Sequence, residues 1–229
     1  MVIGKGLIAS LFMTSDDELN SKVVFFASGV SNSLEERAES FLREENLLRE
    51  TISKFSDKIF VYFSTCSIYD KSKKNSKYVL HKLEMEKIVK SSGLKFLILR
   101  VSNATGRGGN PNLLMNYIIN SIKKGDVLDI HAKATRNIID VEDVKNITEY
   151  LLNRNILNRI INVGYCENYK ITEIITIIEN FYKIQAKVNI IQAGTSYLIN
   201  TKELDEYFIE KKMNDKKKYM ENILKKYYL

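Results

Sequence analysis

The chain has 229 residues, of which 45% are hydrophobic and 28% charged, and its formal net charge is +7. This length can bury a sizeable core, and the ordinary apolar fraction excludes an intrinsically disordered chain. No apolar run reaches the roughly 18 residues of a membrane span, and the start lacks a long apolar signal segment. The two cysteines, Cys66 and Cys166, form neither a disulfide framework nor a zinc cluster. We therefore expect a reduced, cytoplasmic protein.

Short apolar runs alternate with longer amphipathic segments along the chain. The predicted strands are Val23–Ala27, Ile59–Phe63, Phe96–Leu99 and Ile160–Val163. The predicted helices between and after them are Leu34–Phe55, Ser76–Ser92, Asn112–Lys124, Glu142–Asn153 and Ile171–Phe181. Continuous apolar strands separated by helices build βαβ units, so the pattern predicts an α/β fold with a Rossmann-type parallel sheet covered on both faces.

The alternation of apolar strands and amphipathic helices is interrupted in the second half of the chain. Asp126–Ile139 contains two short strand-like pieces around His131–Thr135, which indicates a smaller α+β portion from about residue 106. We place the boundary between residues 105 and 106, with strand 159–163 returning to the main sheet. The lysine-rich tail Lys202–Leu229 has the pattern of an amphipathic helix with solvated charges, so the positive balance does not predict a nucleic-acid surface.

A glycine turn comes near the start of the chain. Gly4-Lys5-Gly6-Leu7-Ile8-Ala9 has the form GxGxxA, follows the hydrophobic Met1–Ile3 and opens a helical run. Such a turn lets a pyrophosphate approach the backbone at a helix N-terminus, where unpaired N–H groups favour anions. An ordinary tight turn is the alternative, because no acidic residue ends a second strand about 20 residues later.

A second motif lies at the start of the predicted helix Ser76–Ser92. Tyr78 and Lys82 form a YxxxK pair, and this spacing places both side chains on one helix face. Ser64 and Thr65 close the preceding strand and supply hydroxyl groups. An ammonium favours the phenolate form of a nearby tyrosine, so this set can hold a substrate oxygen and move a proton during hydride transfer.

Several ordered motifs resemble a known family. VYFSTCSIYD, YVLHK and LKFLILRVSNATGRGGNP are similar to the extended short-chain dehydrogenase/reductases of the NAD-dependent epimerase/dehydratase family, which act on nucleotide sugars. The resemblance continues through RNIIDVEDV and covers roughly Val23 to Leu204. It implies that Thr65 is the catalytic hydroxyl, that Tyr78 is the proton donor or acceptor, and that Lys82 holds the nicotinamide ribose and lowers the tyrosine pKa.

The resemblance and the glycine turn together imply the binding residues. The expected contacts to NAD or NADP are Gly4, Lys5, Gly6, Leu7, Ile8, Ala27, Ser28, Gly29, Ser64, Tyr78 and Lys82. The expected contacts to the nucleotide-sugar substrate are Thr65, Asn103, Asn112, Leu113 and Arg136, the last as a clamp on the diphosphate. On this basis the portion 1–105 binds the dinucleotide and the portion 106–229 mainly binds substrate. No metal site is expected.

Other conspicuous residues have simpler interpretations. Asn103 could instead cap a turn, and Asp143 is expected to fix a helix start rather than take part in chemistry. His81 is expected at the surface. Cys66 is expected to be a small packing residue, since nothing in the sequence marks it as a nucleophile.

The chain also departs from the family. The stretch from Gly4 to Ser64 is about half as long as in the family, and the missing part corresponds to the second and third strands. Thr65-Cys66-Ser67 stands where the dehydratases carry Thr-Asp-Glu, which disfavours elimination of water. The resemblance therefore implies a nucleotide-sugar keto-reductase or 4-epimerase for surface polysaccharide synthesis, acting as a homodimer through the helices Leu34–Phe55 and Ser76–Ser92. The alternative is a non-catalytic nucleotide-sugar or dinucleotide-binding protein, or a partner subunit.

Overall fold

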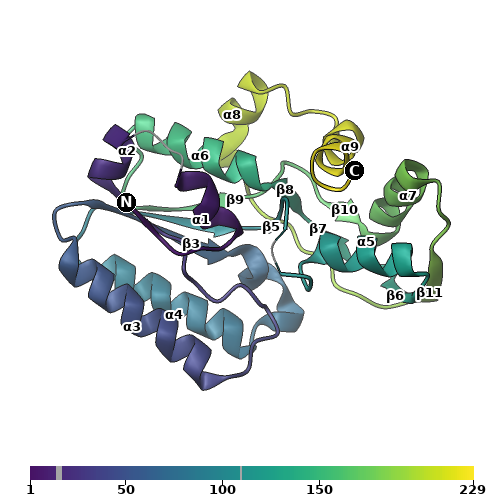
Figure 1. Ribbon diagram of the computed structural model, residues 1–229, viewed down its shortest axis with the longest axis horizontal. Coiled ribbons are helices and arrows are strands. Elements are labelled where there is room, and N and C mark those ends of the chain that lie inside the picture. Colours follow the sequence, from purple (N-terminus) through teal and green to yellow (C-terminus); the bar gives the residue numbers. More distant parts are fainter. Residues whose placement is uncertain (14–16, 109) are drawn as a thin grey trace.

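A parallel five-stranded sheet forms the centre of the molecule (Figure 1). The computed structural model describes residues 1–13, 17–108 and 110–229. The strands lie in the order β1-β2-β3-β4-β9, and their bounds are β1 Val2–Ile3, β2 Val23–Phe26, β3 Ile59–Thr65, β4 Phe96–Val101 and β9 Arg159–Val163. Each neighbouring pair is parallel. The predicted α/β class with a Rossmann-type sheet is confirmed.

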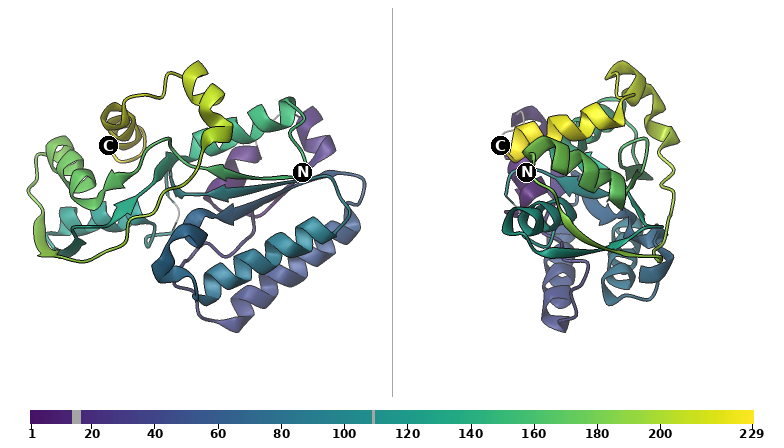
Figure 2. Two further views of the ribbon diagram at one scale, coloured as in Figure 1. Left: turned by 180° about the vertical axis from the view of Figure 1, so that it is seen from behind. Right: turned by 90° about the vertical axis from the view of Figure 1, so that its right-hand side faces the viewer.

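Helices cover both faces of this sheet, which explains why its strands are continuous apolar runs. Phe60 and Ile98 point to the face covered by α3 (Ala38–Lys54) and α4 (Lys77–Ser91). Val61 points to the opposite face, where α1 (Leu7–Phe12) and α6 (Val141–Asn153) lie. Figure 2 shows the two helical layers on opposite sides of the sheet. Alternate residues of one strand therefore contribute to two different cores.

The sheet is short on the side of β1. The chain between β1 and β2 contains α1 and α2 (Asp17–Lys22), and in its described part no strand. Among the described residues β1 pairs with β2 alone and forms the edge of the sheet. The strand order consequently rises in one direction, without the reversal that marks the ligand crevice of a doubly wound sheet. The family resemblance implies that two strands, the second and third of the family's sheet, are absent from this side.

A smaller portion carries three two-stranded ladders and its own core. The strands are β5 Asn103–Thr105, β6 Val127–His131, β7 Thr135–Arg136, β8 Ile138–Asp140, β10 Tyr169–Lys170 and β11 Lys187–Ile191. β5 pairs with β8 and β6 with β11 in parallel, whereas β7 and β10 are antiparallel. α5 (Leu114–Lys124) and α7 (Ile171–Tyr182) pack on these strands. Since β9 and α6 belong to the main layer, the chain passes between the two portions more than once.

The tail is divided into two helices rather than one amphipathic stretch. After a 3-10 turn at Lys202–Leu204, α8 (Asp205–Glu210) buries Tyr207 and Phe208 in the main core. α9 (Lys216–Tyr227) buries Met220 and Leu224 in the core of the smaller portion. The tail therefore fastens the two portions together. None of the helices in the described ranges combines the length and apolar character needed to span a bilayer.

Asp143 lies in the first turn of α6, at the helix start as expected, but it does not cap the helix. Asp140 caps α6, because its carboxylate accepts the backbone N–H of Glu142 at 2.8 Å. Asp143, three residues after Asp140, accepts a hydrogen bond from the hydroxyl of Tyr219 in α9 at 2.6 Å. Burial raises the pKa of Asp143, and the hydrogen bond from Tyr219 acts in the opposite direction. Asp143 thus ties the tail to α6.

Candidate functional site

A cavity of about 550 Å³ opens at the carboxyl ends of β1, β2, β3 and β4, where parallel sheets bind their ligands. It extends from the glycine turn of the main layer to the start of α5 in the smaller portion. Of the residues predicted to bind ligand, those that line it are Lys5, Gly6, Leu7, Ile8, Ala27, Ser28, Gly29, Ser64, Thr65, Tyr78, Lys82, Asn103, Asn112 and Leu113. Gly4 and Arg136 are not among its lining residues.

The charged residues in the cavity wall are all basic. Lys5, Arg43, Lys73 and Lys82 line it, and no described carboxylate does. Arg43 donates to the carbonyl oxygen of Ser28 at 3.0 Å and remains exposed at the rim. Burial lowers the pKa of Lys73. A concave surface with one sign of charge attracts ligands of the opposite sign, so the cavity suits an anionic molecule such as a diphosphate.

Thr65, Tyr78 and Lys82 all line this cavity. Thr65 ends β3, and its hydroxyl oxygen accepts the backbone N–H of Ser67 at 3.0 Å. Ser76 caps α4, which places Tyr78 and Lys82 one turn apart in its first two turns. The Tyr78 hydroxyl makes no hydrogen bond to any other described residue, and the side chain is almost fully buried. It is therefore available to a ligand.

A residue that the sequence prediction missed lies directly below Lys82. Glu44 of α3 is completely buried, and its Oε1 lies 2.9 Å from Lys82 Nζ. Tyr62 donates its hydroxyl to Oε1 at 2.7 Å, and the backbone N–H of Val30 donates to Oε2 at 2.6 Å. Burial by itself raises the pKa of Glu44, but the Lys82 charge and the hydrogen bonds outweigh it and hold that pKa well below its usual range.

His81 also faces this carboxylate, so the expectation that it lies at the surface is wrong. Its Nε2 is 3.1 Å from Glu44 Oε2, and its side chain is only 9% exposed. Its ring packs against Phe41 of α3, with 4.8 Å between the ring centroids. Three residues make nearly a full helical turn, so His81 shares the inner half of α4 with Tyr78 instead of pointing away from it.

A second buried carboxylate, Glu86, lies on α4 one turn after Lys82. Glu86 Oε2 is 2.6 Å from Arg100 Nη2, and Glu86 Oε1 accepts Arg100 Nε at 2.9 Å. The hydroxyl of Ser64, predicted as a cofactor contact, donates to the same Oε1 at 2.6 Å. Ser64 lines the cavity, but its hydrogen is committed to Glu86. Its role at the ligand is consequently limited to accepting a hydrogen bond.

Two glycines allow close approaches at the strand ends. Gly4 has φ of +130°, and a β-carbon there would lie 2.4 Å from the carbonyl oxygen of Ala27. It therefore packs β1 against β2 below the cavity. A β-carbon at Gly29 would lie 2.4 Å from Lys82 Nζ and 2.9 Å from Glu44 Oε1. Gly29 thus leaves the space that the ion pair occupies.

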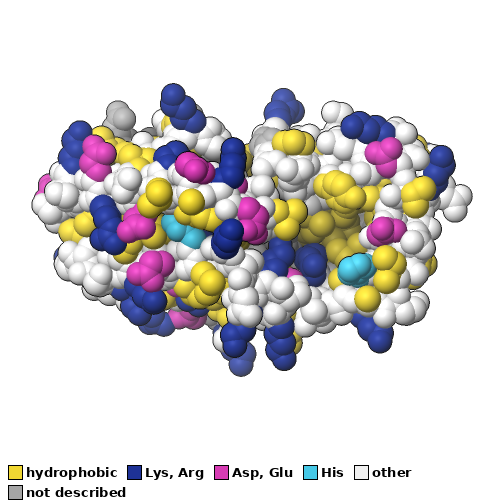
Figure 3. All heavy atoms as spheres, turned by 90° about the horizontal axis from the view of Figure 1, so that it is seen from below, with side chains coloured by type: hydrophobic (Ala, Val, Ile, Leu, Met, Phe, Trp, Pro, Cys, Tyr) yellow, Lys and Arg dark blue, Asp and Glu magenta, His cyan; other side chains and the backbone are white. Residues whose placement is uncertain are grey.

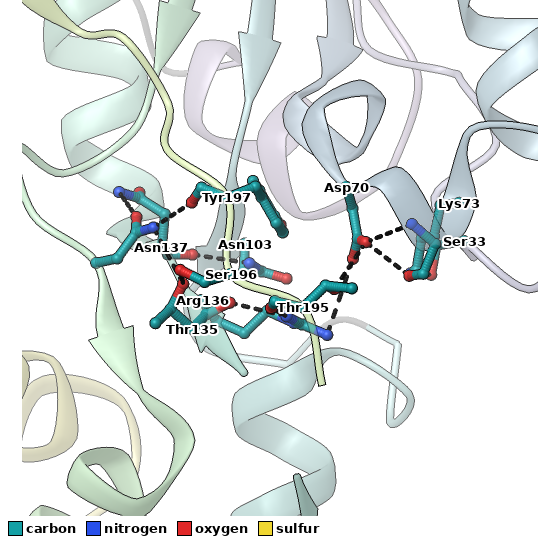
Figure 4. A network of polar contacts seen from close by, with 12 residues as sticks. Ser33, Asp70, Lys73, Asn103, Thr135, Arg136, Asn137, Thr195, Ser196 and Tyr197 are labelled. Carbon is teal, nitrogen blue, oxygen red and sulfur yellow. Dashed lines mark hydrogen bonds and ion pairs between the residues drawn. The ribbon is translucent and has the colours of Figure 1, made fainter. Parts of the chain in front are cut away.

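Arg136 lies in a polar network beside the cavity (Figure 4). Its Nη1 donates to the carbonyl oxygen of Thr135 at 2.8 Å, and its Nη2 is 3.9 Å from Asp70 Oδ2. Thr195, from the segment between β11 and α8, donates to Asp70 Oδ1 at 3.0 Å. This network connects the loop after β3 with the smaller portion. The diphosphate contact of Arg136 stays a prediction, and in this structure the guanidinium is directed at Asp70.

Asn103 ties two strands together and also faces the cavity, and its contact to the substrate stays a prediction. Its amide nitrogen donates to the carbonyl oxygen of Asn137 at 2.7 Å, which fixes β5 beside β8, and the residue also lines the cavity. Cys66 is buried as expected, and burial raises the pKa of its thiol. It packs beneath the strand end and does not reach the cavity.

Asp70 should make stability pH-dependent. Burial raises the pKa of Asp70, but hydrogen bonds from Ser72 and Thr195 outweigh it and leave that pKa below its ordinary value. Its contribution is therefore present above the unfolded pKa of about 4 and is lost as pH falls below it. We expect Asp70→Asn to lower the free energy of unfolding by about 1 kcal/mol at pH 7 and by less at pH 3.5.

Urea unfolding between pH 3.5 and 7 measures this difference. The exposed Asp126 provides the control, since Asp126→Asn should leave the free energy of unfolding within about 0.5 kcal/mol of wild type at each pH. A gap between wild type and Asp70→Asn that stays constant over this range would contradict the assignment.

The cavity wall fits a nicotinamide dinucleotide in its chemistry. Its basic residues match a pyrophosphate, and the glycine turn Gly4–Gly6 lies at its edge between β1 and α1. Ser102, at the end of β4, has a buried hydroxyl without a hydrogen-bond partner among the described residues, and it lines the same cavity. A buried hydroxyl of this kind requires a polar partner, which a bound ligand can supply.

Comparison with known proteins agrees with this geometry. The model of the NAD dependent epimerase/dehydratase family matches residues 14–164, which include β3, α4 and β4. The chain belongs to the NAD dependent epimerase/dehydratase family. The match begins after the glycine turn, in keeping with the short first part of the sheet. No protein with a curated function matches the sequence significantly.

Solved structures of similar fold lie at low sequence identity. UDP-glucuronic acid 4-epimerase from Bacillus cereus, in complex with UDP-glucuronic acid and NAD, is 16% identical with a TM-score of 0.68, over 93% of this chain and 80% of that one. RMD from Pseudomonas aeruginosa, complexed with NADPH, has 17% identity and a TM-score of 0.68 over 90% and 80%. UDP-N-acetylglucosamine 4-epimerase from Methanobrevibacter ruminantium has 19% identity and a TM-score of 0.68 over 94% and 79%. These likenesses establish the family's fold for this chain.

Proposed function

We propose that the protein is an NAD- or NADP-dependent oxidoreductase that reduces or epimerises a nucleotide-linked sugar. One observation carries the proposal: Thr65, Tyr78 and Lys82 line a single cavity together with Lys5 and Gly6 of the glycine turn and with the basic side chains of Arg43 and Lys73. The fold likeness to nucleotide-sugar 4-epimerases with NAD, and to a protein with NADPH, supports the same conclusion.

Each side chain has a distinct task in this proposal. The dinucleotide, when bound, supplies the hydride carrier. Tyr78 donates a proton to the sugar oxygen at its phenol, or accepts one there, in the way of a general acid or base. Thr65, fixed at the end of β3, donates its hydroxyl hydrogen to the same oxygen and orients it. Lys82 donates to the ribose hydroxyls, and Lys5 and Arg43 bind phosphate oxygens nearer the rim.

The wall of the cavity favours reduction or epimerisation over dehydration. Elimination of water needs a further acid or base near the reacting carbon, and no described carboxylate lines the cavity. Cys66, which stands where the dehydratases have an acid, is buried away from it. A keto-reductase or a 4-epimerase requires only the Thr65, Tyr78 and Lys82 set.

A binding experiment tests this function. Calorimetric titration with NAD, NADP, UDP-sugars and dTDP-sugars should show micromolar binding of one dinucleotide and of one nucleotide sugar, followed by turnover of the pair monitored at the nicotinamide absorbance. Failure of both dinucleotides to bind would overturn the proposal.

The second candidate is a non-catalytic nucleotide-sugar-binding protein. The edge position of β1 favours it, because the strands that would support the adenosine half of a dinucleotide are missing from the described sheet. In that case the titration would detect the nucleotide sugar alone, without turnover at any dinucleotide concentration.

Further expectations concern assembly and location. We propose a homodimer through α3 and α4, where Leu42 and Leu80 are 56% and 54% exposed. Figure 3 shows hydrophobic side chains among mixed charges on the half of the underside that these helices occupy. Sedimentation velocity checks this, and a single monomeric species would contradict it. The cytoplasmic location is proposed from the composition of the sequence, and the role in surface polysaccharide synthesis is proposed from the family resemblance.

A further inference from the structure

Glu44 is a completely buried carboxylate below the floor of the cavity. Groups from three parts of the main layer converge on it: the loop after β2 through Val30, β3 through Tyr62, and α4 through Lys82 and His81. A buried ionised carboxylate is costly unless it is paired and hydrogen-bonded, and removal of its partner leaves an uncompensated charge. The charged partner of Glu44 is Lys82, which lines the cavity, so this pair connects the buried carboxylate to the ligand site.

We propose that Glu44 is the positioning residue of Lys82, holding the ammonium at one place in the cavity floor and supplying its counter-charge before a ligand arrives. The inference rests on the proposed function, in which Lys82 binds the dinucleotide. Glu44 does not line the cavity and acts through Lys82.

The hydrogen bonds of the ammonium group give Lys82 a fixed direction. An ammonium has three N–H donors. One is directed at Glu44 Oε1 at 2.9 Å and a second at the Tyr62 hydroxyl oxygen at 3.2 Å. The third is left for the cavity that Lys82 lines. A β-carbon at position 29 would lie 2.4 Å from Nζ, so Gly29 leaves room for the ammonium in this position.

Glu44 itself cannot turn away from Lys82. The backbone N–H of Val30 holds Oε2 at 2.6 Å, and the Tyr62 hydroxyl holds Oε1 at 2.7 Å. Burial raises the pKa of Tyr62, so its hydroxyl remains a donor at any working pH. Both carboxylate oxygens are thus fixed by groups of the rigid sheet and its adjoining loop.

The charge of Glu44 matters as much as its hydrogen bonds. An ammonium buried without a counter-charge readily gives up its proton, and a neutral amine loses its attraction for a ribose or phosphate oxygen. The carboxylate removes this tendency. The net attraction for an anionic ligand is then left to Lys5, Arg43 and Lys73, which are more exposed than Lys82.

Other titratable groups lie near the Glu44–Lys82 pair, and each of them could contribute to a pH dependence of binding. Tyr78 and His81 come from α4 and Tyr62 from β3, while Glu86, also on α4, is already paired with Arg100. Histidine is the one of these residue types whose ordinary pKa lies near neutral pH. The experiment must therefore separate a change at His81 from a change at Lys82.

Glu44→Gln keeps the size of the side chain and removes its charge. We expect the Kd for the dinucleotide that wild type binds, measured by fluorescence titration between pH 6 and 9, to rise with pH relative to wild type, by up to about tenfold per pH unit once Lys82 loses its proton. Glu45→Gln is the matched control, since Glu45 is the next residue of α3 and pairs with Arg49. It should follow wild type at every pH.

A double-mutant cycle assigns the new pH dependence to Lys82. In the Lys82→Met background, Glu44→Gln should no longer add any pH dependence to dinucleotide binding. A dependence that persists in this background originates from His81 or another group and overturns the proposal.

Glu44→Asp separates position from charge, and it keeps the proposal testable if Glu44→Gln does not fold. It retains the carboxylate but is one methylene shorter. We expect a Kd several-fold higher than that of wild type with an unchanged pH dependence. A wild-type Kd for Glu44→Asp, or a Glu44→Gln variant that behaves like Glu45→Gln, would show that Glu44 does not position Lys82. If wild type binds neither NAD nor NADP, the proposed function itself fails.

Discussion

Tyr78→Phe should lower kcat for the nucleotide sugar by about 10²- to 10⁴-fold, the contribution typical of a positioned general acid or base. The phenylalanine keeps the ring, which packs with Val30 and Val79, and removes only the hydroxyl. Because that hydroxyl bonds to no other described residue, the fold loses little by its removal. The Kd for the dinucleotide should therefore stay within about threefold of wild type, a difference below 1 kcal/mol. Steady-state kinetics and fluorescence titration measure the two effects separately.

Tyr117→Phe is the matched control for this change. Tyr117 lies on α5, is 52% exposed and does not line the cavity, so its variant should keep the wild-type kcat. Loss of turnover in both variants would indicate a general effect of the substitution. Undiminished turnover by Tyr78→Phe would remove Tyr78 from the mechanism and favour the non-catalytic binding protein.

The main layer could be predicted from the sequence because its strands are buried on both faces. The run Ile59–Phe63 is apolar at every position, and the structure extends it to Thr65 through pairing with β4. The predicted start of α3 at Leu34 is too early. The helix begins at Ala38, because Asn32 accepts the backbone N–H of Leu34 in a local turn and Glu35 binds Arg37. Local side-chain contacts of this kind leave no signal in hydrophobic periodicity.

The sequence predicted those residues of the candidate site that belong to a motif. The YxxxK pair and the strand-end hydroxyl placed Tyr78, Lys82 and Thr65 at one cavity. Glu44 belongs to no motif, but the sequence contains a signal for it. It occupies the buried stripe of α3 between Phe41 and Leu48, where a hydrophobic residue is the rule. A charged residue on the inner stripe of a helix identifies a buried partner, although the sequence alone does not say that the partner is Lys82.

The same reasoning applies to α4, whose inner stripe carries Lys82 and Glu86. Glu86 is 3% exposed and makes a bidentate pair with Arg100 of β4. We expect Glu86→Ala to lower the free energy of unfolding by about 3–5 kcal/mol, because it leaves the mostly buried guanidinium without a counter-charge. It also leaves the Ser64 hydroxyl without its acceptor. Urea denaturation at pH 7 gives the magnitude.

Glu84 on the exposed side of the same helix is the control for Glu86. It forms a surface pair with Lys87, and Glu84→Ala should cost no more than about 0.5 kcal/mol. Combining Glu86→Ala with Arg100→Met should recover part of the loss, since the double variant buries no unpaired charge. A cost for Glu86→Ala as small as that of Glu84→Ala would mean that Arg100 reaches solvent when its partner is removed. Ser64 and Thr65 end β3 directly beside this pair. If Glu86 stabilises the strand end and does not contact the ligand, the double variant should also keep its affinity for the dinucleotide.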